Sequence, residues 1–166
     1  ELVSNNKKSY VHSHGNDYTY DCLIQDAEKF NSFTKNRPLV FIVANNTYDC
    51  LTGYVGLIRS NAVVALINDS IHESIWNDLV IKFKPVFIYQ PKNLFQCEKV
   101  GGEKFKFGKY VLYETNAEID YDINSDLSLL LMTSGSTGSP EFVRLSHANI
   151  CSNTKAICEY LKIGKD

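Results

Sequence analysis

The sequence has no long apolar run. Its apolar segments, such as residues 39–44 and 62–67, are only as long as strands, whereas a membrane-spanning helix needs about 20 consecutive apolar residues. Residues 1–17 also lack the apolar core of a signal peptide. We therefore predict no membrane association. The chain starts at Glu1 rather than at a methionine, which favours a processed protein or a piece of a longer one.

The sequence also has no large excess of charge of one sign. The formal net charge is -2, and no block of like charge is longer than the pair Lys7-Lys8. Nucleic-acid binding therefore has no electrostatic support, and tyrosines and phenylalanines without interleaved basic residues indicate a core. With 44% hydrophobic and 22% charged residues, the chain has the composition of one globular domain rather than of a disordered segment.

Paired cysteines are missing as well. The five cysteines are widely spaced and include no CxxC pair, which favours reduced thiols and a cytoplasmic location. Cys151 and Cys158 lie seven residues apart on one face of a predicted helix, where we expect buried packing. His12 and His14 are close in sequence, but no Cys or carboxylate partner has ligand spacing. We predict that they are surface residues, and we predict no metal site.

The first half of the chain alternates segments of helical periodicity with continuous apolar runs. This alternation predicts an α/β fold, in layers, with a mainly parallel sheet flanked by helices and right-handed crossovers. We expect Asp21 to cap the first helix and Pro85 to stop the third. The predicted helices fall within residues 21–33, 48–60 and 71–83, and the predicted strands are 39–44, 62–67 and 85–90.

The second half of the chain is less regular. The pattern loosens from residue 91 to 125, where residues 103–107 and 109–114 can form two strands flanking Gly108. Residues 127–132 resume the buried-strand pattern, and residues 142–145 are typical of a short strand. Ser146 is then a suitable cap for a last helix.

A loop rich in hydroxyl groups lies between these last two strands. Residues 133–139 are Thr-Ser-Gly-Ser-Thr-Gly-Ser. Glycines allow positive φ, and successive backbone N–H groups can then form a concave anion site to which hydroxyls add donors. Ligands also bind at the ends of parallel strands in open α/β sheets. The loop therefore predicts a phosphate ligand, although its composition alone fits a flexible turn equally well. The Walker pattern is excluded by the spacing.

The order of residues 133–149 closely resembles the signature loop of the adenylate-forming superfamily, which includes acyl-CoA synthetases, luciferases and peptide-synthetase adenylation domains. The family pattern is Thr-Ser-Gly-Ser/Thr-Thr-Gly-x-Pro-Lys-Gly-Val, often followed by Leu-Ser/Thr-His-x-Asn. Residues 15–23, 40–68 and 125–131 are similar to earlier family segments in the same order. The signature positions matched here are Thr133 to Gly138, Pro140, Val143, Leu145, Ser146, His147 and Asn149.

This resemblance implies that residues 1–166 are the N-terminal part of an AMP-binding (adenylation) domain, the N-terminal portion of the large domain, with the C-terminal catalytic domain absent. It implies an AMP-forming acid–thiol ligase, in which a carboxylate attacks the α-phosphate of ATP to give an acyl-adenylate and pyrophosphate. A thiol such as CoA or a carrier protein commonly takes the acyl group, and Mg²⁺ accompanies the nucleotide. The implied contacts to the β- and γ-phosphates come from Thr133, Ser134, Gly135, Ser136, Thr137 and Gly138.

The sequence departs from the family at the end of this loop. The family lysine aligns with Glu141, and the following glycine aligns with Phe142. Two unit charges about 4 Å apart interact by about 4 kcal/mol at an effective dielectric near 20, so this reversal predicts weaker nucleotide binding unless Glu141 turns away. Arg144 is no simple replacement, because three residues along a strand it points to the opposite face.

A second departure concerns what would follow Asp166. The adenine- and ribose-binding motifs, the acyl pocket and the catalytic lysine of the family have no counterpart in these 166 residues. We expect the chain alone not to catalyse adenylation, and no catalytic residue can be assigned. The alternative is a non-catalytic binding or interaction module that retains the fold with an altered loop. An apolar face left uncovered in either case predicts self-association.

Overall fold

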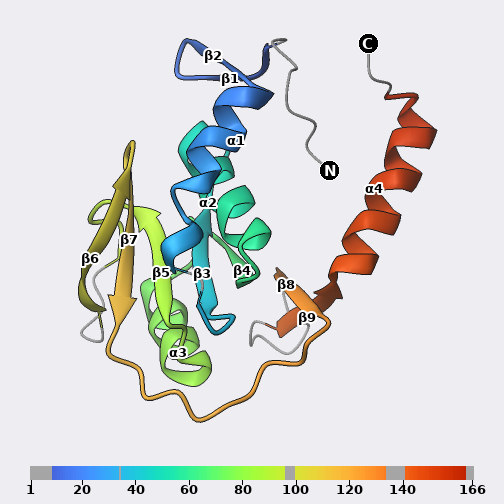
Figure 1. The fold of residues 1–166 in the computed structure, drawn as a ribbon. Coiled ribbons are helices and arrows are strands. Elements are labelled where there is room, and N and C mark those ends of the chain that lie inside the picture. Colours follow the sequence, from blue (N-terminus) through green and yellow to red (C-terminus); the bar gives the residue numbers. More distant parts are fainter. Residues whose placement is uncertain (1–8, 34, 96–99, 134–140, 164–166) are drawn as a thin grey trace.

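The computed structural model describes residues 9–33, 35–95, 100–133 and 141–163 (Figure 1). Within these residues, a seven-stranded sheet has the order β6-β7-β5-β3-β4-β8-β9, and a two-stranded sheet consists of β1 and β2. The strands are β1 (Ser9–Ser13), β2 (Asn16–Thr19), β3 (Leu39–Ala44), β4 (Val63–Asn68), β5 (Phe87–Pro91), β6 (Val100–Phe107), β7 (Tyr110–Thr115), β8 (Leu127–Thr133) and β9 (Glu141–Ser146). The helices are α1 (Tyr20–Glu28), α2 (Tyr48–Arg59), α3 (Glu73–Phe83) and α4 (His147–Leu161), with a 3₁₀ turn at Asn31–Phe33.

The centre of the sheet is parallel, and both ends are antiparallel. Strand β3 pairs in parallel with β4 and β5, and β4 pairs in parallel with β8. Strands β7 and β6 add antiparallel pairs at one end, and β9 adds one at the other. The predicted α/β fold and the predicted strand pair on either side of Gly108 are therefore confirmed.

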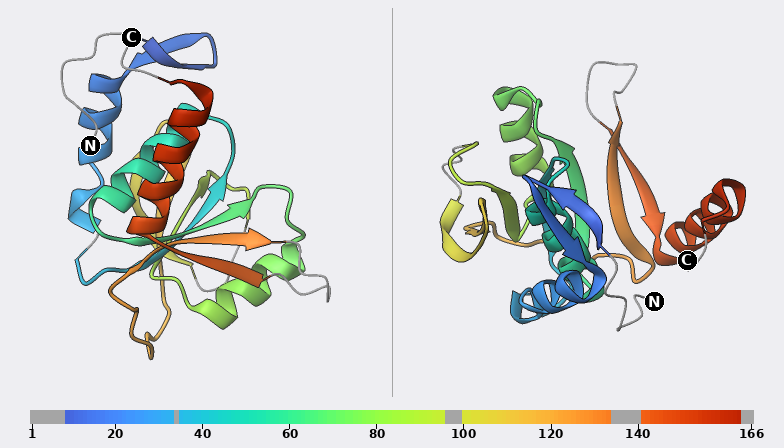
Figure 2. Two further views of the ribbon diagram at one scale, coloured as in Figure 1. Left: turned by 90° about the vertical axis from the view of Figure 1, so that its right-hand side faces the viewer. Right: turned by 90° about the horizontal axis from the view of Figure 1, so that it is seen from above.

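The sheet separates two hydrophobic clusters, because β3 and β4 are buried on both faces. Val40 and Ile42 of β3 pack with residues of α2 such as Leu57, whereas Phe41 packs with Trp76 of α3. Seen from above, α3 lies on one side of the sheet, and α1 and α2 lie on the other (Figure 2). The continuous apolar runs of the sequence follow from this double coverage.

The first helix begins earlier and ends earlier than predicted. Its N-cap is Thr19, whose side-chain oxygen accepts a hydrogen bond from the backbone N–H of Cys22 at 3.2 Å. Asp21 lies within the first turn, where its negative charge stabilises the helix dipole instead of capping the end. The helix ends at Glu28, and the chain turns so that the Phe30 ring lies edge-on to Tyr89 in the core, 5.4 Å between centroids.

The last helix has the predicted cap but not the predicted packing. Ser146 and Asn149 form a capping box, in which each side chain bonds the backbone N–H of the other residue. Helix α4 then extends away from the rest of the molecule (Figure 1), and none of its described residues is buried. Cys151 is exposed and Cys158 is half-buried, so the prediction of buried packing for this pair is wrong. Among the described residues, no second layer covers the helix.

Three buried tyrosines make stability sensitive to alkaline pH. Burial raises the pKa of Tyr48, Tyr89 and Tyr110 above the ordinary 10.0. The hydroxyls of Tyr89 and Tyr110 donate to the backbone carbonyls of Asp49 and Val43, both at 2.9 Å. Because the folded state holds these protons more tightly than the unfolded state, their contribution is complete below pH 10 and is lost as the pH rises further.

We therefore expect a cooperative loss of far-ultraviolet circular dichroism above about pH 10, together with the late part of the tyrosinate absorbance change. The variant Tyr89→Phe keeps the ring but removes one titrating hydroxyl, so its alkaline transition should be shallower than that of the wild type. Complete tyrosinate formation with an unchanged dichroism spectrum would contradict this explanation.

Candidate functional site

The candidate site lies at one edge of the sheet. Because β3, β4 and β8 are parallel neighbours, their carboxyl ends meet at the same edge, the usual position of ligand sites in open α/β sheets. The segments that leave this edge begin at Asn45, Asp69 and residue 134. The signature loop is therefore connected to the edge that favours ligand binding.

Only the first of the predicted phosphate-binding residues is placed by the structure. Thr133 is the last residue of β8 and is exposed, and its hydroxyl donates to the backbone carbonyl of Glu141 at 3.3 Å. Thr133 and Glu141 are also direct partners in the β8–β9 pair. Both ends of the loop are thus held by strand pairing. The other five predicted residues, Ser134, Gly135, Ser136, Thr137 and Gly138, lie outside the described residues.

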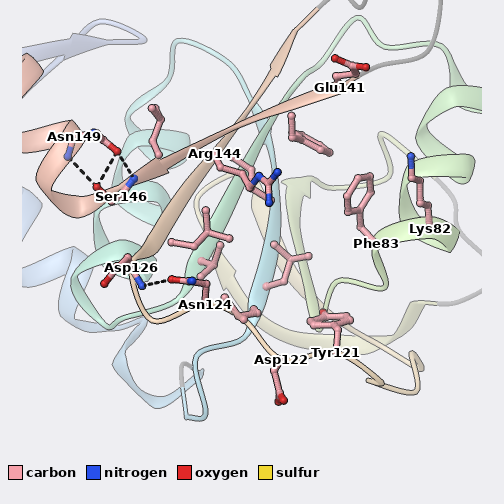
Figure 3. A pocket seen from close by; sticks show the side chains of 17 residues that line it. Lys82, Phe83, Tyr121, Asp122, Asn124, Asp126, Glu141, Arg144, Ser146 and Asn149 are labelled. Atoms are coloured by element: carbon pink, nitrogen blue, oxygen red, sulfur yellow. Dashed lines mark hydrogen bonds between the residues drawn. The ribbon is translucent and has the colours of Figure 1, made fainter.

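The structure also places the residue that reverses the family charge. Along β9, Phe142 packs in the α3-side cluster and Leu145 in the α2-side cluster, so alternate residues face opposite sides. Arg144 therefore shares the face of Phe142, and Glu141 lies on the other face, as predicted. Glu141 lies at the loop end of β9, and its carboxylate points away from Arg144 (Figure 3). No side chain of β9 supplies the missing cation next to Thr133.

A polar crevice lies between the carboxyl ends of β3 and β4. Helix α2 follows β3 onto one face of the sheet, and α3 follows β4 onto the other face, so the strand order changes direction here. The crevice has a volume of about 430 Å³. Its polar lining residues are Asn45, Asn46, Asn68 and Asp69.

Two of these asparagines are oriented by local hydrogen bonds. The Asn45 side-chain oxygen accepts from the Thr47 hydroxyl at 2.6 Å, and the Asn68 side-chain oxygen accepts from the Ser70 backbone N–H at 2.9 Å. Their amide N–H groups remain as donors beside Asp69. The sequence analysis missed these residues, although polar residues directly after the apolar runs 39–44 and 62–67 are a usable signal.

The described residues offer no ready metal site. They contain no group of three or more His, Cys, Asp or Glu side chains that could hold an ion. His12 Nδ1 lies 2.8 Å from the Asp17 carboxylate, and both side chains are exposed. Cys50 is a free, buried thiol whose pKa is raised by burial.

Within the part of the chain that the structure describes, no helix is both long enough and apolar enough to span a bilayer.

Comparison with known proteins adds the structural context. No family model matches the chain. ATP-bound MatB from Rhodopseudomonas palustris is similar with a TM-score of 0.66 and 15% identity, over 99% of this chain and 37% of that one. The Bacillus subtilis o-succinylbenzoate CoA synthetase MenE, in complex with its acyl-adenylate intermediate, has a TM-score of 0.65 and 13% identity, over 92% of this chain and 42% of that one. A fatty acyl-adenylate ligase from L. pneumophila, in complex with acyl adenylate and pyrophosphate, has a TM-score of 0.62 and 15% identity, over 91% of this chain and 29% of that one.

These similarities cover almost the whole of this chain but well under half of each solved protein: 37%, 42% and 29% of their lengths. At identities of 13% to 15%, the similarity concerns the fold. That fold is the one predicted from the order of residues in the signature loop. The chain therefore has the α/β fold that these solved adenylate-forming enzymes show over part of their length.

Proposed function

We propose that this chain carries the polyphosphate-binding part of an ATP-dependent ligase that activates a carboxylate as an acyl-adenylate. The observation that supports this most is the position of the signature loop, which joins Thr133 at the carboxyl end of β8 to Glu141 of β9. The fold that presents the loop is shared with MatB, which has been solved with ATP bound. We propose residues 1–166 as the N-terminal part of the adenylation domain of a longer cytoplasmic enzyme.

The proposed role of the loop is to position the leaving pyrophosphate. Thr133 and the hydroxyls of Ser134, Ser136 and Thr137 would donate to the β- and γ-phosphates, while Gly135 and Gly138 would let the backbone approach. Mg²⁺ would accompany the nucleotide and neutralise part of its charge. The polar crevice between the carboxyl ends of β3 and β4 fits this role, because its asparagine amides are donors. Positioning and charge stabilisation are the main contributions that a protein makes to such a transfer.

The proposed partners follow from the same chemistry. They are ATP, a carboxylic acid and a thiol acceptor such as CoA or a carrier protein. We propose that adenylation requires segments equivalent to the remainder of the longer solved enzymes, so that these residues alone are inactive. The uncovered α4 also supports self-association of the isolated chain, since Ile157, Tyr160 and Leu161 are all exposed.

Glu141 favours a second candidate function. A carboxylate at the start of β9, directly opposite Thr133 in the strand pair, repels an anion that approaches the loop. A chain with this substitution can keep the fold as a non-catalytic binding or interaction module. The two functions differ in whether the loop binds nucleotide, which a titration measures directly.

We expect the variant Glu141→Lys to bind Mg-ATP at least tenfold more tightly than the wild type, because it replaces repulsion by attraction. The full charge interaction is about 4 kcal/mol at 4 Å, and the exposure of Glu141 reduces this by screening. Isothermal titration calorimetry of both proteins checks the prediction.

The matched control is Glu28→Lys, which makes the same charge change at an exposed position on α1 and should leave the affinity unchanged. Tight binding by the wild type would support the ligase. Binding seen only in Glu141→Lys would support the non-catalytic module. If Glu141→Lys gained nothing over the wild type, Glu141 would not lie close to a bound phosphate.

A further inference from the structure

A second and larger cavity lies on the α3 face of the sheet, with a volume of about 1050 Å³. That is just above the range for small-molecule sites, about 300–1000 Å³. It is bounded by the end of α3, the segment 121–127, and strands β8 and β9 (Figure 3). Thr133, the one predicted phosphate-binding residue that the structure describes, does not line it, whereas Glu141 does. Its floor includes Leu39 and Val63, the first residues of β3 and β4, which lie at the opposite ends of these strands from the proposed nucleotide edge.

The floor of this cavity is apolar and firmly packed. Leu39, Val63 and Leu130 line it, and each is at most 7% exposed. Two phenylalanine rings form its wall: Phe83 and Phe142 lie edge to face, with centroids 5.0 Å apart. Both also pack against the buried Phe41. An aromatic ligand adds further edge or offset contacts to such a wall, beyond the effect of buried area.

Two cations line the cavity. Arg144 projects from β9 toward the middle of the cavity (Figure 3), and Lys82 lies on the α3 side with its amino group 5.3 Å from the Phe83 ring centroid. Within the described residues, neither side chain makes an ion pair or a side-chain hydrogen bond. A guanidinium group beside apolar surface favours a carboxylate, which it can bind through two parallel hydrogen bonds.

Three carboxylates also line the cavity, and they limit where an anion can bind. Asp122 points outward at the lower rim, and Glu141 points away at the loop end (Figure 3). Asp126 lies beside Asn124, whose side-chain oxygen accepts from the Asp126 backbone N–H at 2.9 Å. None of the three is within 4.0 Å of Arg144 or Lys82. The position that favours an anion is therefore at Arg144, directly above the apolar floor.

We infer that this cavity is a binding site for an aromatic carboxylate, with the ring against Phe83 and Phe142 and the carboxylate on Arg144. The inference goes beyond the proposed function, because it assigns a second ligand site on another part of the sheet. A ligand of two fused rings is small enough to enter this volume, and Lys82 is a second cation in the lining.

The test uses the 166-residue chain with no nucleotide present. We expect 2-naphthoate to bind saturably, with one molecule per chain and at least tenfold more tightly than neutral 2-naphthamide, which has nearly the same shape. Calorimetry gives the affinities, and quenching of the single tryptophan, Trp76, gives an independent readout, because Trp76 packs on Phe41 at 6.0 Å between centroids.

The decisive variant is Arg144→Gln, which should lower the naphthoate affinity to that of naphthamide. Its matched control is Arg59→Gln, at an exposed position on α2 and on the opposite face, which should retain wild-type affinity. Equal affinity for naphthoate and naphthamide, no saturable binding, or naphthoate binding that survives Arg144→Gln would each overturn the inference. Tighter binding of octanoate than of naphthoate would overturn the aromatic assignment. Failure here leaves the Mg-ATP prediction unaffected, because the two titrations share no ligand.

Discussion

Replacing Gly53 by alanine will destabilise the protein by about 2 to 3 kcal/mol, the upper part of the range for overpacked cores. The direction is notable because glycine-to-alanine in a helix interior normally stabilises by about 0.5–1 kcal/mol. Gly53 is a buried residue of α2. A Cβ atom there would lie 2.7 Å from both Cδ1 and Cζ of Tyr89, and closer still to Cε1.

Tyr89 cannot move aside to admit that methyl group. Its side chain is 0% exposed, its hydroxyl is bonded to the carbonyl of Asp49, and its ring packs on Phe30 and Tyr110. The steric cost therefore exceeds the gain in helix propensity, and the net effect is a loss of stability.

Urea unfolding followed by Trp76 fluorescence measures this loss. The control is Gly102→Ala in β6, where the added Cβ meets no atom within 4 Å and only a small change is expected. If Gly53→Ala proved as stable as the wild type, the close packing of α2 on β5 would be wrong.

Truncating Trp76 to alanine will cost about 3 to 5 kcal/mol, as for other large buried aromatic residues. Trp76 is 0% exposed in α3. It stacks on Phe95, 4.9 Å between centroids, and lies edge-on to Phe41. Its removal leaves a cavity between α3 and the sheet, under the same cluster that supports the proposed carboxylate site.

The variant Trp76→Phe separates cavity formation from loss of the indole N–H. Within the described residues the indole nitrogen has no hydrogen-bond acceptor, so its loss removes no protein–protein hydrogen bond. We expect Trp76→Phe to cost less than half as much as Trp76→Ala, measured by urea unfolding monitored by circular dichroism. Equal costs for the two variants would mean that the size of the cavity does not determine the loss of stability.

Much of the fold could be predicted from the sequence because its strands are buried on both faces. The runs 39–44 and 62–67 lie in the middle of the sheet and became β3 and β4 almost unchanged. The third helix ends at Phe83, before Pro85, as expected. Lys84, between them, takes a left-handed conformation that caps the helix. Sequence patterns were sufficient to predict the structure where burial of a strand, or a proline after a helix, was the main cause.

The predictions failed where the outcome depended on partners distant in sequence. The packing of Cys151 could not be read from helical periodicity, because periodicity shows which face is apolar but not whether anything covers it. Asn45 and Asn68 are ordinary polar residues in sequence and become neighbours only because β3 and β4 are parallel. The order of residues in the signature loop predicted the fold better than its composition did.

The pairing of β8 with β4 has a consequence for the order of folding. Val64 lies opposite Leu129, and closing such a long loop is entropically costly before any contact forms. Strands β3, β4 and β5, each joined to the next by one helix, can associate first through shorter loops. We therefore expect β8 to dock late, leaving the edge of β4 open in a folding intermediate that can pair wrongly with other chains. The strand that presents Thr133 would then be among the last to take its place.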